Sequence, residues 1–146
     1  MFQYHILNHK RKALLLLLTY FKSSFYLARG TGLALHIGHR KSIDFDFFTD
    51  QDINTDQLFI KIHKVFDGHK VLKIQEEVNT LTVLIDEDIK LSFMTYPYPL
   101  VDKLVSDDIF KVASVKDIAC MKMSAILSRA TWKDYVDLYF LLKDFY

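Results

Sequence analysis

The stretch that decides the fold is FYLARGTGLALHIGHRKSIDFDFF, residues 25–48. Its hydrophobic pattern predicts four successive elements, a short apolar strand at 25–28, a turn at 30–32, a short helix at 33–37 and a second strand at 42–48. Gly38 is suited to end the helix in a left-handed conformation. We expect the other elements to be arranged around this strand, turn, helix and strand.

Two acidic residues, Asp44 and Asp46, lie in the second of these strands, where Phe45 and Phe47 alternate with them. Because residues two apart point to the same side of a strand, both carboxylates are expected on one polar face. Carboxylate oxygens are ligands for hard divalent cations. The spacing therefore predicts a metal site beside a glycine turn that could bind phosphate, although a solvated sheet face is the alternative.

The composition fits one ordinary domain with a buried core, because 51% of the 146 residues are hydrophobic and 25% are charged. The 12 Phe and 8 Tyr suggest that rings fill much of that core. A net charge of +1 gives no bulk field that favours DNA or a membrane. Residues 42–56 contain five aspartates and no Lys or Arg, which is compatible with cation binding or with a solvated loop.

Two features concern the compartment. The apolar run at 13–21 is too short to span a bilayer, so we expect it to be the buried part of a first helix and the protein to have no membrane partner. The single Cys120 cannot form an internal disulfide, and its apolar helical surroundings predict a buried thiol. We therefore expect a cytoplasmic protein.

The remaining elements are read from periodicity and capping signals. We predict a helix at 2–22, a helix at 58–66 preceded by Asn54 or Thr55 as N-cap, strands at 71–77, 80–86 and 90–96, a helix at 114–130 opened by Ser114, and a last helix from 131 onwards. Pro97 and Pro99 are expected to end the sheet. Four aromatic residues of the last helix are expected in the core: Trp132, Tyr135, Tyr139 and Phe140.

This order of elements predicts an α+β (mixed α/β) domain, a small mixed sheet with helices packed on one side of it and a C-terminal helical pair. We expect a single domain over residues 1–146, with the core at about 23–100 and the C-terminal helices at about 114–146. No internal repeat or low-complexity segment divides the chain.

Two motifs occupy opposite parts of the chain. The first comprises GTGLAL at 30–35 and GHRKSIDFDFF at 38–48, and the second comprises DIACMKMSAILSR at 117–129 and KDYVDL at 133–138. In this order they resemble the motifs of the AbiEii/AbiGii-type toxin nucleotidyltransferases, a family of the DNA-polymerase-beta-like nucleotidyltransferase superfamily. The resemblance implies a nucleotidyltransferase-like fold whose C-terminal helices close over a nucleotide.

The resemblance also implies an activity, the transfer of a nucleoside monophosphate from an NTP to an acceptor, often tRNA or another RNA, by a toxin that an antitoxin restrains. Two Mg²⁺ ions are expected, held by Asp44 and Asp46. The predicted catalytic residues are Asp44, Asp46, Lys122 and Asp137, and the predicted nucleotide- or phosphate-binding residues are Gly30, Thr31, Arg40, Ser42 and Arg129.

Several of these residues have a second interpretation. The N–H groups of Gly30 and Thr31 could cradle phosphates, but a glycine turn alone is a weak signal. Arg40 could contact the nucleotide or fix its own loop through an aspartate. Asp134 is as well suited to cap the last helix as to act in catalysis. Lys122 lies on an otherwise apolar helix face, which favours an anion as its partner.

Two positions depart from the family's pattern. Arg29 stands where the family usually has a glycine before Gly30, and Ser92 stands where the wider superfamily has a third carboxylate. A serine is neither a strong base nor an anionic ligand. The sequence therefore predicts either an active metal-dependent nucleotidyltransferase or a catalytically degenerate member that binds a nucleotide or a protein.

Overall fold

A computed structural model describes residues 2–128 and 131–144 of the chain. The elements, in order, are η1 (Tyr4–Ile6), α1 (His9–Ala13), α2 (Leu15–Leu18), η2 (Thr19–Phe21), β1 (Tyr26–Leu27), α3 (Arg29–Ile37), β2 (Phe45–Thr49), α4 (Thr55–Val65), β3 (Val71–Glu77), β4 (Thr80–Ile85), β5 (Ile89–Thr95), β6 (Val105–Ser106), β7 (Lys111–Val112), α5 (Val115–Ser128) and α6 (Trp132–Asp144).

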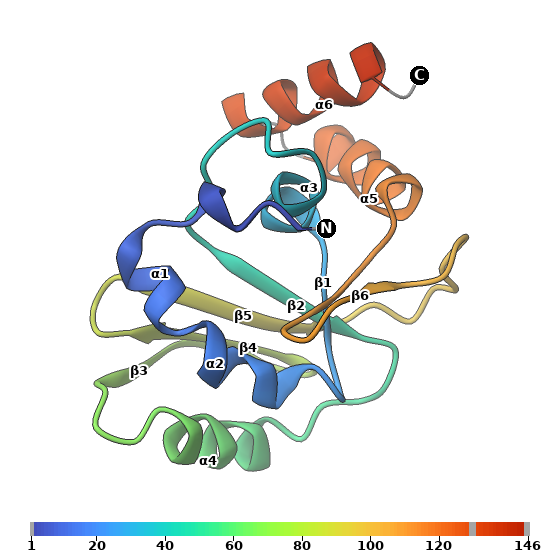
Figure 1. The fold of residues 1–146 in the computed structure, drawn as a ribbon. Helices are drawn as coiled ribbons and strands as arrows, with labels where there is room; N and C mark the ends of the chain where they lie inside the picture. Colours follow the sequence, from blue (N-terminus) through green and yellow to red (C-terminus); the bar gives the residue numbers. More distant parts are fainter. Residues whose placement is uncertain (1, 129–130, 145–146) are drawn as a thin grey trace.

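The strands of the described residues form one mixed sheet in the order β3-β4-β5-β2-β1-β7-β6 (Figure 1). β2 runs parallel to β5 and β1 runs parallel to β7, whereas the other neighbouring pairs are antiparallel. The predicted α+β class, a mixed sheet with helices packed on it, is confirmed.

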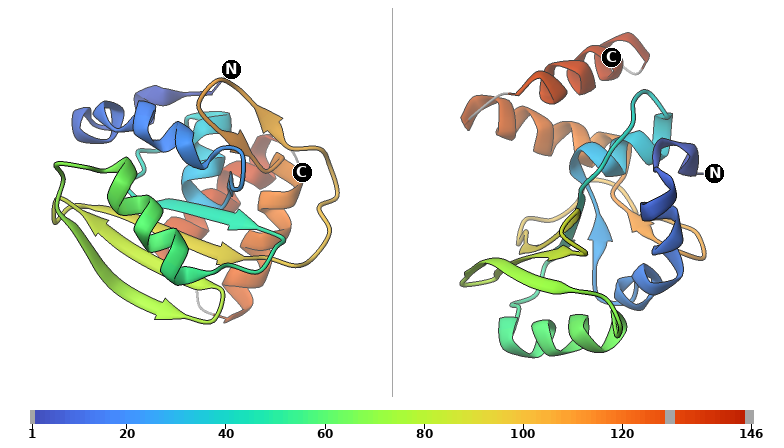
Figure 2. Two further views of the ribbon diagram at one scale, coloured as in Figure 1. Left: turned by 90° about the horizontal axis from the view of Figure 1, so that it is seen from below. Right: turned by 90° about the vertical axis from the view of Figure 1, so that its left-hand side faces the viewer.

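Helices lie on both sides of this sheet, so the prediction of helices on one side only is wrong. α4 contacts β3 and β4 from one side, and α3 contacts β2, α5 and α6 on the other. Figure 2 shows α5 and α6 as a pair that stands away from the strands, on the side opposite α4. No helix within the described residues is long and apolar enough to cross a membrane.

The core beneath β2 is built largely from aromatic rings, as the composition predicts. The ring of Phe47 is 5.0 Å from that of Phe93, 5.9 Å from that of Phe21 and 6.2 Å from that of Phe110, measured between centroids. All four side chains are almost wholly buried. These rings fix one side of β2, while Asp46 and Phe48 lie on its other side.

The prediction of one helix over residues 2–22 is wrong, because the segment forms four short pieces. The side chain of Asn8 accepts a hydrogen bond from the Arg11 N–H at 3.0 Å, so α1 begins at His9. Leu14, with ψ near −3°, separates α1 from α2. The leucine run predicted burial on more than one side, but Leu16 is 78% exposed, and the run gave no sign of these local breaks.

The predicted turn at residues 30–32 is also wrong, because these residues form the first turn of α3. The chain turns one residue earlier, at Arg29, whose φ is +58°. Gly38 ends α3 with φ +63°, as predicted. β2 begins only at Phe45, so Asp44 precedes the strand, and Ile43 is 47% exposed rather than part of the core.

Three further predictions are corrected. The sheet does not end at Pro97 and Pro99, since β6 and β7 extend it past β1. Cys120 is exposed, not buried. Of the four aromatic residues expected in the core from the last helix, Trp132, Tyr135 and Tyr139 are each more than half exposed.

Other predictions are confirmed. β3 covers the predicted residues 71–77, and Asn54 is the residue that caps α4, accepting a hydrogen bond from the Gln57 N–H at 3.1 Å. Ser114 opens α5, with its hydroxyl accepting a hydrogen bond from the Asp117 N–H at 3.1 Å.

The aromatic cluster gives a stability prediction. Replacing Phe47 with Ala should lower the free energy of unfolding by about 3–5 kcal/mol, because a large buried ring is lost and a cavity remains. Leu16→Ala is the control, since Leu16 is 78% exposed and should change stability little. Denaturant unfolding checks this, and equal effects of the two variants would contradict the described core.

Candidate functional site

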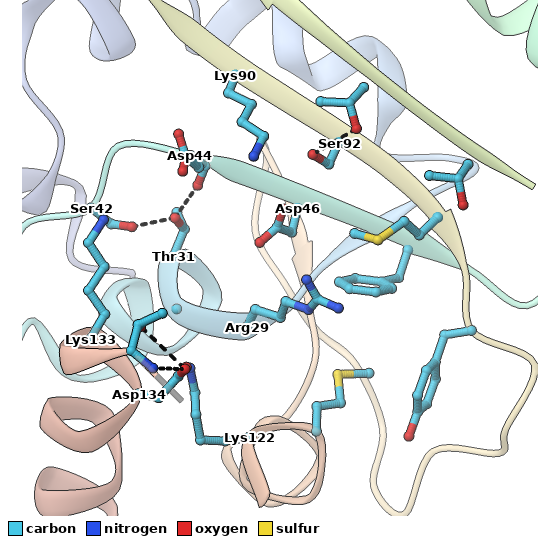
Figure 3. A pocket seen from close by; sticks show the side chains of 18 of the residues that line it. Arg29, Thr31, Ser42, Asp44, Asp46, Lys90, Ser92, Lys122, Lys133 and Asp134 are labelled. Carbon is cyan, nitrogen blue, oxygen red and sulfur yellow. Dashed lines mark hydrogen bonds and ion pairs between the residues drawn. The ribbon is translucent and has the colours of Figure 1, made fainter. Parts of the chain in front are cut away.

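A cavity of about 630 Å³ lies over the polar face of the sheet, between the start of α3 and the helices α5 and α6 (Figure 3). The predicted site residues that line it are Gly30, Thr31, Arg40, Ser42, Asp44, Asp46 and Lys122. Asp137 lies outside its lining, and Arg129 lies outside the described residues. The structure thus brings residues from both sequence motifs to one place.

The floor of the cavity is a row of polar side chains that crosses neighbouring strands. Asp46 on β2 is in register with Ser92 on β5, which is in register with Thr82 on β4. The Thr82 hydroxyl donates a hydrogen bond to the Ser92 hydroxyl at 3.2 Å. Ser92 therefore occupies the strand position beside Asp46 that was expected from the sequence, and no carboxylate stands there.

Asp44 and Asp46 line the cavity together although Asp44 precedes the strand. Within the described residues, neither carboxylate accepts a hydrogen bond or lies within ion-pair distance of a basic group. Burial, reinforced by the charge of Asp44, raises the pKa of Asp46, and the positive charges of Arg29, Lys90 and Lys122 oppose this only in part. Two neighbouring carboxylates without internal partners are suited to an external cation.

The loop that carries Asp44 is fixed from two sides. The buried Thr31 hydroxyl on α3 contacts the Ser42 hydroxyl and donates a hydrogen bond to the backbone carbonyl of Asp44. On the other side, Arg11, which is only 3% exposed, donates from Nε to the Ile43 carbonyl at 3.0 Å. The position of the carboxylate is therefore set by rigid neighbours.

The N-terminus of α3 opens into the cavity without a side-chain cap, because its N-cap residue is Ala28. Gly30 and Thr31 line the cavity within this first turn. Backbone N–H groups of a first helical turn have no partner inside the helix, so they can bind an anion such as phosphate. A Cβ at Gly30 would lie 2.2 Å from Arg40 Nη2, so this position requires glycine while Arg40 keeps its place.

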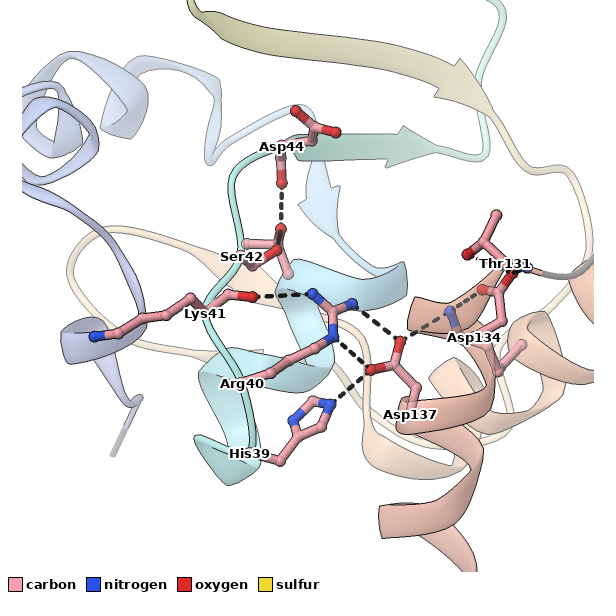
Figure 4. Close-up of polar contacts among 10 residues, drawn as sticks. His39, Arg40, Lys41, Ser42, Asp44, Thr131, Asp134 and Asp137 are labelled. Carbon is pink, nitrogen blue, oxygen red and sulfur yellow. Dashed lines mark hydrogen bonds and ion pairs between the residues drawn. The ribbon is translucent and has the colours of Figure 1, made fainter.

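Asp137 is the centre of a buried charged cluster (Figure 4). It accepts hydrogen bonds from His39 Nε2 at 2.6 Å and Arg40 Nε at 2.8 Å, and it lies 2.9 Å from Lys122 Nζ. Its side chain is 0% exposed. Burial opposes its ionisation, but the hydrogen bonds from His39, Arg40 and Lys122 outweigh burial and hold its pKa far below the usual value. Through these contacts Asp137 links α6 to α5 and to the loop that follows α3.

Asp134 caps α6, as one interpretation of its sequence position predicted, and it also pairs with Lys122. It accepts a hydrogen bond from the Thr131 N–H at 2.9 Å and another from Lys122 Nζ at 2.6 Å. Lys122 is 6% exposed and forms ion pairs with Asp134 and Asp137. It also lines the cavity. Arg40 fixes its loop through Asp137, as one interpretation predicted.

Five charged residues that line the cavity were not among the predicted site residues: Arg29, Glu77, Lys90, Lys133 and Asp134. Lys90 could have been found, since it precedes Ser92 by two residues in the same strand and so points to the same face. Lys133 stands within the second sequence motif. Glu77 reaches the cavity because it ends β3, which pairs with β4.

The comparisons with known proteins agree with this arrangement. A family model described as "Nucleotidyl transferase AbiEii toxin, Type IV TA system" matches residues 16–146. The Aquifex aeolicus (strain VF5) protein aq_aa25, described as uncharacterized, is 41% identical over 124 residues, which are 83% of this chain and 59% of that protein. The chain therefore spans less than two thirds of this curated relative.

Solved structures share the fold. A candidate nucleotidyltransferase from H. pylori has a TM-score of 0.67 and 17% identity, over 93% of this chain and 68% of that one. JHP933 from Helicobacter pylori has a TM-score of 0.67 and 18% identity, over 99% and 69%. The Megavirus polyadenylate synthase has a TM-score of 0.66 and 14% identity, over 94% and 32%.

The charged cluster predicts sensitivity to acid. The pKa values of Asp137 and Asp134 are lower in the folded protein than the unfolded value of about 3.9, so their ionised forms stabilise the fold above that value. This stabilisation is lost as the pH falls below about 4. The pKa of Asp46 is raised in the folded protein, so protonation of Asp46 at low pH instead stabilises the fold.

We expect the free energy of unfolding to fall by roughly 1–3 kcal/mol between pH 6 and pH 3, measured by urea unfolding. Asp144→Asn is the control, because it removes an exposed carboxylate of the same helix and should leave this dependence unchanged. Stability that does not change over this range would contradict the paired state of these aspartates.

Proposed function

The chain belongs to the AbiEii nucleotidyl transferase toxin family, and we propose on that basis that it transfers a nucleoside monophosphate from an NTP to an acceptor hydroxyl. One observation carries the proposal. Asp44 and Asp46 lie together in a cavity, without internal partners among the described residues, beside the uncapped N-terminus of α3. The buried aspartates of the described residues that serve the fold, such as Asp117 and Asp137, are fully paired.

The donor set fits a magnesium ion. Asp44 and Asp46 supply hard oxygen ligands, and burial raises the pKa of Asp46 despite the nearby charges of Arg29, Lys90 and Lys122. Bound there, Mg²⁺ would neutralise phosphate charge and polarise the α-phosphate of the nucleotide. We therefore assign both aspartates to the metal.

The other residues of the cavity suit the triphosphate. The N–H groups of Gly30 and Thr31 can hold the β- and γ-phosphates at the start of α3. Lys133 also lines the cavity and forms no ion pair within the described part of the chain, so its ammonium can meet the same anion. Lys122 stays fixed by Asp134 and Asp137 and contributes its charge from a set position.

In the proposed reaction, the oxygen of the acceptor hydroxyl forms a bond to the α-phosphorus of the NTP. The bond between that phosphorus and the oxygen bridging to the β-phosphate breaks, and pyrophosphate leaves with the electron pair. The hydroxyl proton passes to solvent water, because Ser92 offers no carboxylate base beside Asp46. Positioning and electrostatic stabilisation supply most of the rate enhancement in such phosphate chemistry.

We further propose that the acceptor is RNA, with tRNA as the first candidate, and that the protein acts as a toxin held in check by an antitoxin protein. The family description names a toxin of a type IV toxin–antitoxin system. On α6, the exposed rings of Trp132, Tyr135 and Tyr139 lie beside Lys133 and Lys143. Nucleic-acid bases stack on such rings, and nearby cations meet the backbone phosphates.

A second candidate function is a degenerate family member that binds nucleotide or a partner protein without catalysis. Ser92 in place of a carboxylate and Arg29 in place of glycine favour this alternative. It predicts nucleotide binding with no transfer.

The experiment that tests transfer uses the purified protein, Mg²⁺, tRNA and each of the four NTPs labelled at the α-phosphate. We expect label on tRNA from one or more NTPs, and a loss of about a thousandfold in rate with Asp46→Asn, because several kcal/mol of charge stabilisation are removed. The matched control is Asp67→Asn, an exposed aspartate outside the cavity that should leave the rate unchanged.

Label that persists in Asp46→Asn would contradict the assigned site. Nucleotide binding without label on tRNA, other RNA or protein would favour the degenerate binding module instead.

A further inference from the structure

Arg29 adopts a backbone conformation that its residue type disfavours. Its φ of +58° lies in the left-handed region, which costs a non-glycine residue about 1–2 kcal/mol. The other non-glycine residues with positive φ in the described chain lie in the β3–β4 and β4–β5 hairpin turns: Asn79, Asp86 and Glu87. Arg29 instead opens α3, at the edge of the cavity.

The strained backbone of Arg29 directs its side chain along the cavity. Its guanidinium carbon lies 5.4 Å from the centre of the Phe48 ring, on the strand that carries Asp46. Figure 3 shows the guanidinium extended along the cavity on the side of Asp46. It forms no ion pair within the described residues, so its charge is available to a ligand of the cavity.

Lys90 brings a second cation from the other side. It precedes Ser92 by two residues in β5, the strand that lies parallel to β2, and so shares the face of Asp46. In Figure 3 its ammonium points into the space beside Asp44 and Asp46. It too forms no ion pair in the described part of the chain.

The carboxylates of the cavity do not match two metal ions. Ser92 holds the strand position next to Asp46 and is hydrogen-bonded to Thr82. No group of three or more His, Cys, Asp or Glu side chains placed to hold a metal ion exists among residues 2–128 and 131–144. A second divalent ion would have to share Asp44 and Asp46 with the first while facing the charges of Arg29 and Lys90.

We propose that this site works with a single divalent ion on Asp44 and Asp46, and that Arg29 and Lys90 supply the positive charge that a second ion would bring. The proposal rests on the nucleotidyl-transfer function above. In it, Arg29 contacts the triphosphate from the start of α3 and Lys90 contacts it from β5. The expectation of two Mg²⁺ ions is replaced by one ion and two fixed side-chain cations.

The test counts bound ions without requiring catalysis. Protein freed of metal is mixed with Mn²⁺ and a saturating α,β-methylene analogue of each NTP in turn, and the Mn²⁺ bound per ternary complex is measured by electron paramagnetic resonance. We expect one Mn²⁺ in the unmodified protein. We expect two in the double variant Arg29→Gly/Ser92→Asp, which removes the guanidinium and restores a third carboxylate.

A second measurement addresses the cation role of Arg29. Arg29→Gly suits the left-handed backbone, so the variant should fold, yet it should bind the Mn²⁺–analogue complex about tenfold more weakly, a change of about 1.4 kcal/mol. Arg29→Lys should recover part of this loss. Lys64→Ala is the control, because Lys64 is exposed on α4, on the opposite side of the sheet.

The outcomes separate this inference from the proposed function. Two Mn²⁺ ions in the unmodified protein with analogue bound would overturn the single-ion site and leave nucleotidyl transfer standing. Unchanged affinity in Arg29→Gly would overturn the role of Arg29. Failure of all four analogues to bind would remove the proposed function and this inference together.

Discussion

The buried carboxylate of Asp137 is the contact on which the arrangement of the site depends. It joins three segments that are far apart in sequence, because His39 and Arg40 follow α3, Lys122 lies on α5 and Asp137 itself lies on α6. A buried carboxylate left without these cations would cost several kcal/mol. The C-terminal helices are thereby held over the cavity, with Lys122 at its edge.

Four aspartates of the described residues form two pairs that their surroundings distinguish. Asp117 and Asp137 are buried and fully paired, and they hold loops and helices together. Asp44 and Asp46 have no internal partner in the described residues, and burial raises the pKa of Asp46. Proteins retain such uncompensated charge where a ligand completes the site, so the second pair marks the candidate active site.

Local pattern was enough to predict the mixed sheet, the strand over 71–77 and the opposite faces of Phe45 and Asp46, because alternation fixes which face a side chain takes. Asp44 lines the same cavity as Asp46, but it precedes β2, so strand alternation does not account for its position. The burial of Arg11 could not be predicted, since its partner Asp88 lies 77 residues away. The exposed rings of α6 were misjudged for a related reason. Periodicity shows that a helix has an apolar face, but not whether the fold covers it.

The contrast between paired and unpaired aspartates can be measured directly. The free energies of unfolding of Asp46→Asn and Asp137→Asn should be compared with that of the unmodified protein at pH 7 in EDTA. We predict that Asp46→Asn is as stable as the unmodified protein or more stable, because burial disfavours the charge that is removed, whereas Asp137→Asn loses about 3–5 kcal/mol. A loss in Asp46→Asn as large as that in Asp137→Asn would contradict the account, because Asp46 would then serve the fold and not a ligand.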